Sequence, residues 1–462
     1  MAIQTNPVQQ RMEYLADMWN DLPIAEYKII CAEIDGQDIE MMNAFHWYML
    51  GTDTPIEDLA IIFESEFADP DTYSLSLVRE LEGVVNLWNE AEMPKGIDKI
   101  PIEWKPDYSI LDKNKALLFV DNLNRLAEEF PLRENQYVVA NLLMPHINMQ
   151  SYIRSWIRKL LDLDLSPNIK ILLTEVKKDK TYDELLLLYP KDIYLWKPDI
   201  DTANVICQTA SMGDPLDSGT DYRSCFARLM KTIGEQNYKK TLDEGEKCIK
   251  IAADNITKDP YWIAQVVTVY VALSNEDYRF GKEKDAFLRA DKAITTGKLM
   301  PDIVGNELGC SVVAQAQLNK ASLFCFGKQW KDAYPLFKDA ADNLVKSNVF
   351  ISALESYRMA GFCADKTGYL SDALDNLYKG YRISENIENE TLQRSTFPFL
   401  IYQLKNLDYK IYISEQELNE RAKEVLGDNW EEIIRSLRKR PDLDNLYADN
   451  PYITEPFDYQ AS

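Results

Sequence analysis

Residues 360–380 read AGFCADKTGYLSDALDNLYKG. The small side chains that end one helical pattern are followed by Gly368 and then by a second helical pattern. In this second pattern Ala373, Leu377 and Gly380 have the spacing i, i+4, i+7, which places them on one helix face. The spacing recurs upstream in Thr241-Gly245-Cys248, Ala286-Ala290-Ala293 and Ala333-Phe337-Ala340. Most of these residues are small and allow a neighbouring helix to come close. The pattern therefore predicts a stack of helix pairs.

The residues that precede these faces point to one repeat family. Before Ala373 the chain contains Tyr357, Gly361 and Gly368, in the order large, small, turn. This order resembles the tetratricopeptide repeat (TPR), and Gly361, Gly368, Ala373 and Leu377 fall at its signature positions. The resemblance covers about residues 222–385, and it implies an all-α array of TPR-like repeats over 222–389.

Two features differ from the standard repeat. The units begin at Thr241, Ala286, Ala333 and Ala373, at intervals of 45, 47 and 40 residues, whereas the standard repeat has about 34. The glycine of the third unit, Gly327, also comes one residue early. We therefore expect longer helices or longer connections between the helix pairs.

Length, hydropathy and net charge indicate the number of domains, the location of the protein and the partners that it disfavours. With 462 residues the chain is long enough for two or three domains. No stretch approaches the ~20 apolar residues of a membrane span, and the N-terminus lacks a secretory pattern, so we expect a cytoplasmic protein. The formal net charge of −24 disfavours nucleic acid and anionic membranes as partners. That charge serves either solubility alone or attraction of a basic partner.

The N-terminal half predicts an α/β layer domain with parallel strands. Short apolar runs at 59–63, 116–121, 169–174 and 193–196 alternate with helical patterns at 73–93, 135–163 and 181–189. Strands separated by helices are typical of a parallel sheet. We expect this domain over 52–207, after a helical segment at 1–51 with helices at 8–22 and 38–50.

The remaining segments have distinct compositions. Residues 208–221 collect Gly, Pro, Ser and Asp and predict a linker. Residues 390–440 predict further helices. The tail 441–462 is acidic and aromatic, and is either a surface-laid tail or a docking peptide. Its docking candidates are Tyr447, Tyr452, Phe457 and Tyr459.

Catalytic chemistry finds little support in the sequence. The layout resembles an AAA-type or STAND-type ATPase core, with Asp121 and Glu175 at expected strand ends. However, the phosphate-binding motif GxxxxGK[ST] is missing, and the turn at 64–69 is acidic. The histidines, His46 and His146, have no ligand-spaced neighbours. The seven cysteines form no CxxC pair, which predicts free thiols. We therefore expect no catalytic residue, metal or cofactor, and no enzyme.

The TPR resemblance also implies a binding face on the first helix of each pair. Polar, cationic and aromatic side chains on such a face suit an extended peptide or a partner helix. The alternative is that this face packs against the α/β domain or the tail. The candidates are Asn275, Tyr278, Arg279, Gln315, Phe326, Arg358, Phe362 and Lys366.

These features together favour a non-catalytic adaptor, scaffold or chaperone that holds a protein partner. One form would be an adaptor that loads effectors or toxins onto a bacterial contractile injection system. Two alternatives remain open at this stage. One is a signalling STAND-type NTPase that uses the repeats as a sensor. The other is a surface glycan or nutrient-uptake protein built on helical repeats, which would need an export signal.

Overall fold

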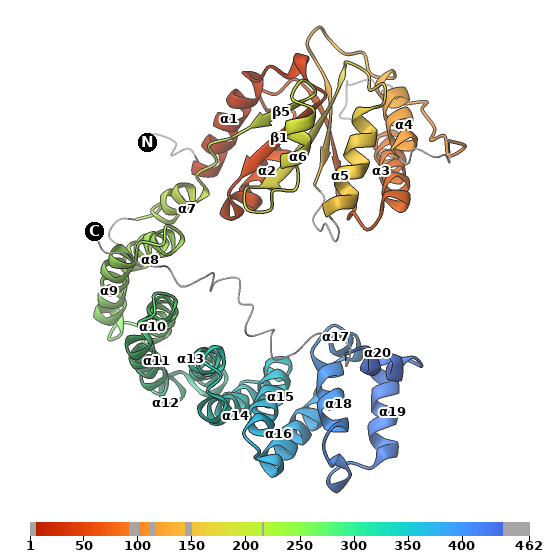
Figure 1. Ribbon diagram of the computed structural model, residues 1–462. Coiled ribbons are helices and arrows are strands. Elements are labelled where there is room, and N and C mark those ends of the chain that lie inside the picture. Colours follow the sequence, from red (N-terminus) through yellow and green to blue (C-terminus); the bar gives the residue numbers. More distant parts are fainter. Residues whose placement is uncertain (1–5, 92–100, 111–115, 144–149, 215–216, 438–462) are drawn as a thin grey trace. The chain divides into compact units, whose positions relative to one another are not determined.

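The computed structural model describes residues 6–91, 101–110, 116–143, 150–214 and 217–437. The chain divides into two compact units, 1–209 and 210–462, and Figure 1 draws both. The first is a parallel sheet with helices, and the described part of the second is helical throughout. The expected fold class is therefore confirmed. Within the described ranges, every helix is too short or too polar to cross a membrane.

The first unit is built on five parallel strands in the order β2-β3-β4-β1-β5. The strands are β1 (Ile29–Ile34), β2 (Leu59–Phe63), β3 (Val138–Leu142), β4 (Ile169–Val176) and β5 (Ile193–Trp196). Because parallel sheets are covered on both faces, their strands bury side chains on both sides. β3 accordingly buries all of its residues.

Helices form a layer on each face of the sheet, as Figure 1 shows. On one face Trp19 and Phe45 pack edge-on against Trp196 of β5, with ring centroids 5.7 and 5.8 Å away. On the other face Trp156 lies 5.0 Å from Tyr73. The first layer contains α1 (Pro7–Asn20) and α2 (Ile39–Tyr48), with α7 (Thr202–Ala210) joining the same core. The second contains α3 (Pro70–Glu90), α4 (Leu117–Ala127), α5 (Gln150–Leu161) and α6 (Asp183–Leu188).

Three sequence predictions in this unit are wrong. The expected helical segment 1–51 contains a strand, β1, which pairs with both β4 and β5 inside the sheet. The expected strand at 116–121 is helix α4, because its apolar positions continue through Leu123 and Leu126 at helical spacing. The expected helix at 135–163 begins instead with strand β3, and helix α5 starts only at Gln150.

The second unit is a succession of packed helices. The predicted linker at 208–221 is shorter than expected, since α7 continues to Ala210 and the next helix begins at Ser218. The helices of the array are α8 (Ser218–Gly234), α9 (Tyr238–Asn255), α10 (Trp262–Arg279), α11 (Glu283–Gly297), α12 (Met300–Val304), α13 (Asn306–Phe326), α14 (Trp330–Lys346), α15 (Phe350–Lys366) and α16 (Leu370–Ile383). Helices α8 to α11 pack in succession, α11 and the short α12 both pack on α13, and α13 to α16 again pack in succession.

One turn repeats between the two helices of each pair. The residue before the second helix's cap has a positive φ at Gln236 (55°), Gly281 (70°), Lys328 (53°) and Gly368 (79°). In the first turn the next N–H, of Asn237, donates to the carbonyl five residues earlier at 3.0 Å. This is the Schellman geometry. The other three turns make the same bond at 2.7, 2.8 and 2.9 Å.

The spacing of these turns reproduces the intervals of the sequence pattern. The positions 236, 281, 328 and 368 are 45, 47 and 40 residues apart. Gly327, the glycine that comes one residue early, has φ −81°, and Lys328 takes the left-handed conformation in its place. The backbone therefore repeats even where the glycine does not.

The small helix faces are buried at the helix contacts, as the sequence predicts. Ala286, Ala333 and Ala373 are each 0 % exposed. A Cβ added to Gly361 would lie 2.6 Å from Leu377, and one added to Gly245 would lie 2.6 Å from a neighbouring leucine. Such distances are too short for carbon atoms, so only glycine allows these helices to pack this closely.

The array continues into a set of shorter helices that share a core with α15 and α16. Phe397, Leu400 and Leu404 are fully buried there together with Leu418. The Ser414 hydroxyl accepts the Glu417 N–H at 3.1 Å and caps α19, as expected for the start of a helix. The helices are α17 (Asn389–Gln393), α18 (Phe397–Lys405), α19 (Glu415–Leu426) and α20 (Trp430–Leu437). The predicted docking tail lies outside the described residues.

Candidate binding surface

Aromatic rings lie in and beside the repeated turns, and we call this set of rings the aromatic seam. Each contact below joins one helix pair to the next. Tyr238 lies 4.9 Å from Phe280, Tyr278 lies 6.1 Å from Phe326, and Trp330 lies 5.6 Å from Phe362. Phe287 and Phe324 stack at 4.4 Å. The seam consists of Tyr238, Tyr278, Phe280, Phe287, Phe324, Phe326, Trp330 and Phe362.

The seam is partly open to solvent. Phe280 is 37 % exposed, and the other seven side chains are half-buried. Half-buried rings of this kind offer apolar surface to a partner without any local unfolding of the helices. Aromatic side chains are also enriched at protein interfaces.

Cations lie over three of the seam rings. Arg279 lies 5.2 Å from the Phe280 ring centroid, and Lys366 lies 5.3 Å from that of Phe362. Lys320 lies 5.6 Å from the ring of Phe324. A cation within about 6 Å of a ring face is attracted to it. Two of these cations also pair with carboxylates of the array, Arg279 with Glu276 at 2.5 Å and Lys320 with Asp291 at 2.6 Å. The seam therefore offers a partner mainly apolar ring surface, bordered by these ion pairs.

The structure brings five of the eight predicted groove residues to this seam. Tyr278 and Phe326 are seam neighbours, and Phe362 carries Lys366 over its ring. Arg279 donates to the Ile233 carbonyl at 3.0 Å, which fixes the end of α8 to α10.

The other three groove candidates lie apart from the seam. Asn275 and Gln315 are exposed on α10 and α13. Arg358 is only 6 % exposed and forms two 2.6 Å hydrogen bonds to Glu355. Most of its guanidinium is therefore packed inside the array beside Glu355, where a partner would not reach it.

A buried polar network of Tyr238, Asp277 and Arg289 lies beside the seam, and the sequence analysis did not predict it. Asp277 is 0 % exposed and accepts hydrogen bonds from Tyr238 Oη at 2.8 Å and Arg289 Nε at 2.7 Å. Burial, followed by the Asp277 carboxylate, raises the pKa of Tyr238 to about 12. The carboxylate thereby joins α9, α10 and α11. An acid next to a seam tyrosine was the only sequence signal for it.

The carboxyl edge of the sheet is where parallel α/β proteins bind ligands. A hollow of about 340 Å³ lies there, beyond β1, β4 and β5. Lys197 pairs with Glu33 at 2.6 Å, and the buried Asp38 accepts the Thr202 N–H at 3.1 Å. The hollow is lined by Glu33, Ile34, Asp35, Gln37, Asp38, Lys177, Lys197, Pro198, Asp199, Ile200 and Asp201. Carboxylates predominate, and they would repel a phosphate group.

The two acids that suggested nucleotide chemistry are placed differently from the expectation. Asp121 lies inside helix α4, because the strand expected at 116–121 does not form. Glu175 lies within β4, where it is 3 % exposed and accepts the Tyr182 N–H at 2.8 Å. Burial raises the pKa of this carboxyl. Neither acid is therefore a carboxylate at the open end of a strand, as magnesium binding to a nucleotide would need.

Metal ligands do not gather in the parts of the chain that the structure describes. No group of three or more His, Cys, Asp or Glu side chains lies close enough there to hold an ion. His46 is fully buried, and its Nε2 lies 3.0 Å from the Thr174 hydroxyl. His146 falls outside the described residues.

Comparisons with known proteins do not supply a family for this chain. No protein-family model matches it, and no curated protein matches it. Its function is therefore inferred from the geometry of the two units.

Proposed function

We propose that this protein is a non-catalytic adaptor or scaffold, whose TPR-like helical array holds a protein partner along the aromatic seam. The observation that carries the proposal is the seam itself. Half-buried rings follow one another across four helix pairs, and cations lie beside three of them. Extended arrays of this kind use long surfaces to bind peptides or helices.

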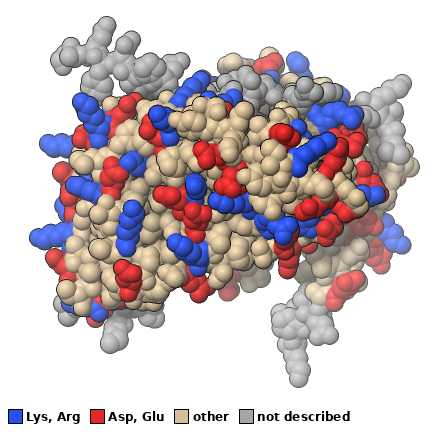
Figure 2. Space-filling view, turned by 90° about the horizontal axis from the view of Figure 1, so that it is seen from below, with Lys and Arg blue, Asp and Glu red and all other residues tan. Residues whose placement is uncertain are grey.

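The partner is a peptide segment or helix that places apolar side chains on the rings of the seam. Aromatic and arginine side chains commonly dominate binding energy at interfaces. Figure 2 shows acidic and basic side chains interspersed over the face that it displays. Local contacts at the seam, more than the net charge of −24, would then select the partner.

Two observations disfavour the alternative of a signalling NTPase. The connection between β1 and α2 has two carboxylates, Asp35 and Asp38, where a phosphate-binding loop would need bare backbone N–H groups. In the hollow at the carboxyl edge, acidic side chains also outnumber lysines by five to two. An NTPase would need positive charge and exposed backbone donors at this position.

The proposal is tested by affinity capture from the native host with three forms of the full chain. The seam variant carries Tyr278→Ala, Phe326→Ala and Phe362→Ala. The matched control carries Tyr261→Ala and Leu299→Ala, which remove exposed apolar side chains (54 % and 56 % exposed) outside the seam. A partner captured by the wild type and the control, but at least tenfold less by the seam variant, supports the proposal.

Folding controls, a second seam variant and a nucleotide-binding measurement complete this test. Circular dichroism and thermal unfolding verify that the seam variant is folded, and Lys320→Glu with Lys366→Glu provides a second seam variant with its apolar core intact. Thermal unfolding with MgATP tests the alternative, because a ligand at 100 times its Kd stabilises a protein by about 2.7 kcal/mol. Stabilisation of that size, with no partner lost from the seam variants, would reverse the assignment.

A further inference from the structure

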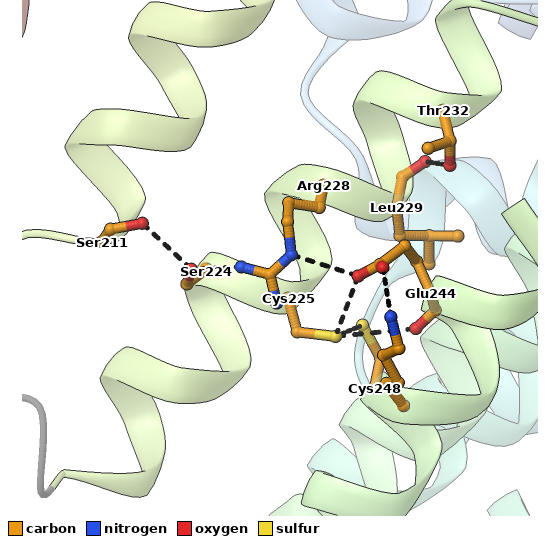
Figure 3. A network of polar contacts seen from close by, with 9 residues as sticks. Ser211, Ser224, Cys225, Arg228, Leu229, Thr232, Glu244 and Cys248 are labelled. Carbon is orange, nitrogen blue, oxygen red and sulfur yellow. Dashed lines mark hydrogen bonds and ion pairs between the residues drawn. The ribbon is translucent and has the colours of Figure 1, made fainter. Parts of the chain in front are cut away.

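Two cysteine sulfur atoms face one another between the first two helices of the array. Cys225 on α8 and Cys248 on α9 have Sγ atoms 2.8 Å apart. Figure 3 shows the two sulfurs side by side. Both side chains are 0 % exposed, and both are free thiols in this structure. A disulfide bond has a length of about 2.05 Å. The two sulfurs thus need only a small approach to bond.

Charged groups surround this thiol pair. Glu244 accepts from Arg228 Nε at 3.1 Å and pairs with Lys247 at 2.5 Å. The Cys225 sulfur lies 3.5 Å from the Glu244 carbonyl oxygen and 3.9 Å from its carboxylate. Figure 3 shows Arg228 and Glu244 beside the two sulfurs. Both cations neutralise the one carboxylate, which would otherwise oppose a thiolate.

The two thiols differ in acidity because of their mutual hydrogen bond. The pKa of Cys225 is lowered, mainly by the hydrogen bond that Cys248 donates to it. Burial opposes this shift, and Arg228 adds to it. The same hydrogen bond, followed by burial, raises the pKa of Cys248. Tyr222, whose pKa is raised by burial, belongs to the same buried cluster as the two cysteines. Cys225 is therefore the thiol that loses its proton first, and thiolates are the nucleophiles in thiol chemistry.

We infer that Cys225 and Cys248 are an oxidation site, at which hydrogen peroxide closes a reversible disulfide that fastens α8 to α9. The Cys225 thiolate attacks one peroxide oxygen, the O–O bond breaks, and hydroxide leaves and takes up a proton as water. Cys225 is then a sulfenic acid. The Cys248 sulfur attacks that sulfur, its proton and the hydroxyl group leave as a second water, and the disulfide forms.

The array contains a second thiol pair that serves as an internal comparison. Cys325 on α13 and Cys363 on α15 are also buried, but their sulfurs are 3.9 Å apart. The Cys363 pKa is raised by its hydrogen bond to Cys325 and by burial. This longer separation predicts that the second pair oxidises much more slowly than the first.

Position in the array favours access to the first pair. α8 is the first helix of the array and packs mainly on α9, whereas α13 and α15 lie further along it. The ends of a repeat array open more readily than its internal elements. Peroxide reaches Cys225 when α8 separates transiently from α9. Once formed, the disulfide prevents this separation.

Peptide mapping of the full-length protein tests this inference directly. The protein is treated with hydrogen peroxide, remaining thiols are blocked with N-ethylmaleimide, and tryptic peptides are analysed without reduction. Peptide 224–228 should be joined to peptide 248–250, at least tenfold more than 321–328 to 359–366. Dithiothreitol should separate the joined peptides. Oxidation should also raise the unfolding midpoint of the helical unit by roughly 5 °C.

Single substitutions test the order of the two steps. In Cys248→Ser, dimedone should trap a sulfenic acid on Cys225, whereas in Cys225→Ser it should label Cys248 at least fivefold less. Arg228→Gln should slow disulfide formation severalfold and Glu244→Gln should accelerate it. Lys379→Gln, which removes an exposed lysine paired with Asp375, should leave the rate unchanged.

Two results would overturn the inference. One is a peroxide-treated wild-type map in which 224–228 and 248–250 remain fully alkylated. The other is a map in which cross-links are spread evenly over the seven cysteines. The wild-type map needs no substitution, so it decides the question even if a cysteine variant fails to fold.

Discussion

Arg289 donates a hydrogen bond from Nε to the fully buried carboxylate of Asp277 at 2.7 Å, and this pair joins α11 to α10 beneath the aromatic seam. Arg289→Met would leave a buried charge without its main counterion, although Tyr238 would still donate to it. Removing one partner of a buried ion pair costs about 3–5 kcal/mol. We therefore expect the free energy of unfolding, measured with urea, to fall by about 3 kcal/mol.

An exposed arginine provides the control for that substitution. Arg394 pairs with Glu390 at 3.4 Å, and the two side chains are 82 % and 78 % exposed. Exposed pairs contribute little, so Arg394→Met should change the free energy of unfolding by less than about 1 kcal/mol. Adding Asp277→Asn to Arg289→Met should restore part of the lost stability. No recovery would mean that the network acts through packing alone.

The repeated turns allow a prediction with opposite signs at equivalent positions. Lys328 has φ 53°, a conformation that costs a non-glycine residue about 1–2 kcal/mol, so Lys328→Gly should raise stability by about 1 kcal/mol. Gly368→Ala should lower it by a similar amount, although no atom lies within 4 Å of the new Cβ. Thermal unfolding of the two variants measures both effects. Equal signs would show that the turn conformation is unimportant.

Close helix packing predicts different outcomes for two helical glycines. A Cβ on Gly361 would lie 2.6 Å from the buried Leu377 and 3.1 Å from the Ala373 carbonyl, so Gly361→Ala should destabilise the array by about 1–3 kcal/mol. Gly83 lies inside α3 with nothing within 4 Å. Gly83→Ala should stabilise the first unit by about 0.5–1 kcal/mol, through helix propensity. Unfolding midpoints of the two variants should therefore move in opposite directions.

The helical array could be predicted from sequence because its signal is local and repeated. The buried faces of Ala286, Ala333 and Ala373 are visible as small residues at helical spacing, and they recur at the same intervals as the turns. The binding surface was harder to predict. Its rings come from the ends of different helices, and Arg358 was placed on it although the structure buries that residue against Glu355.

The sheet was harder still, because short apolar runs do not distinguish strands from helices. Residues 117–120 are uniformly apolar, yet they belong to a helix whose later buried positions include Leu123 and Leu126. β1 ends in Ala-Glu-Ile, and Glu33 interrupts the apolar pattern because it pairs with Lys197 at the sheet edge. Tertiary contacts of this kind cannot be derived from local periodicity.

A buried histidine makes the stability of the first unit depend on pH. Burial lowers the pKa of His46 from about 6.5 to about 4, since its Nε2 meets the Thr174 hydroxyl and its Nδ1 has no partner among the described residues. The folded state therefore holds His46 neutral. Below pH 6.5 the unfolded chain binds a proton that the folded chain does not, so stability should fall between pH 6.5 and 4, by on the order of 3 kcal/mol.

His46→Gln should remove this part of the pH dependence. The raised pKa values of Asp58 and Glu175 act in the opposite direction, but both carboxyls are present in wild type and variant, so the difference between the two proteins isolates His46. Hydrogen exchange of the β4 amides, 169–176, measures the first unit without interference from the second. Protection in wild type should fall more steeply than in His46→Gln as the pH falls from 6.5 to 4, once exchange rates are corrected for pH. Parallel profiles would show that His46 takes up its proton in the folded state at its ordinary pKa.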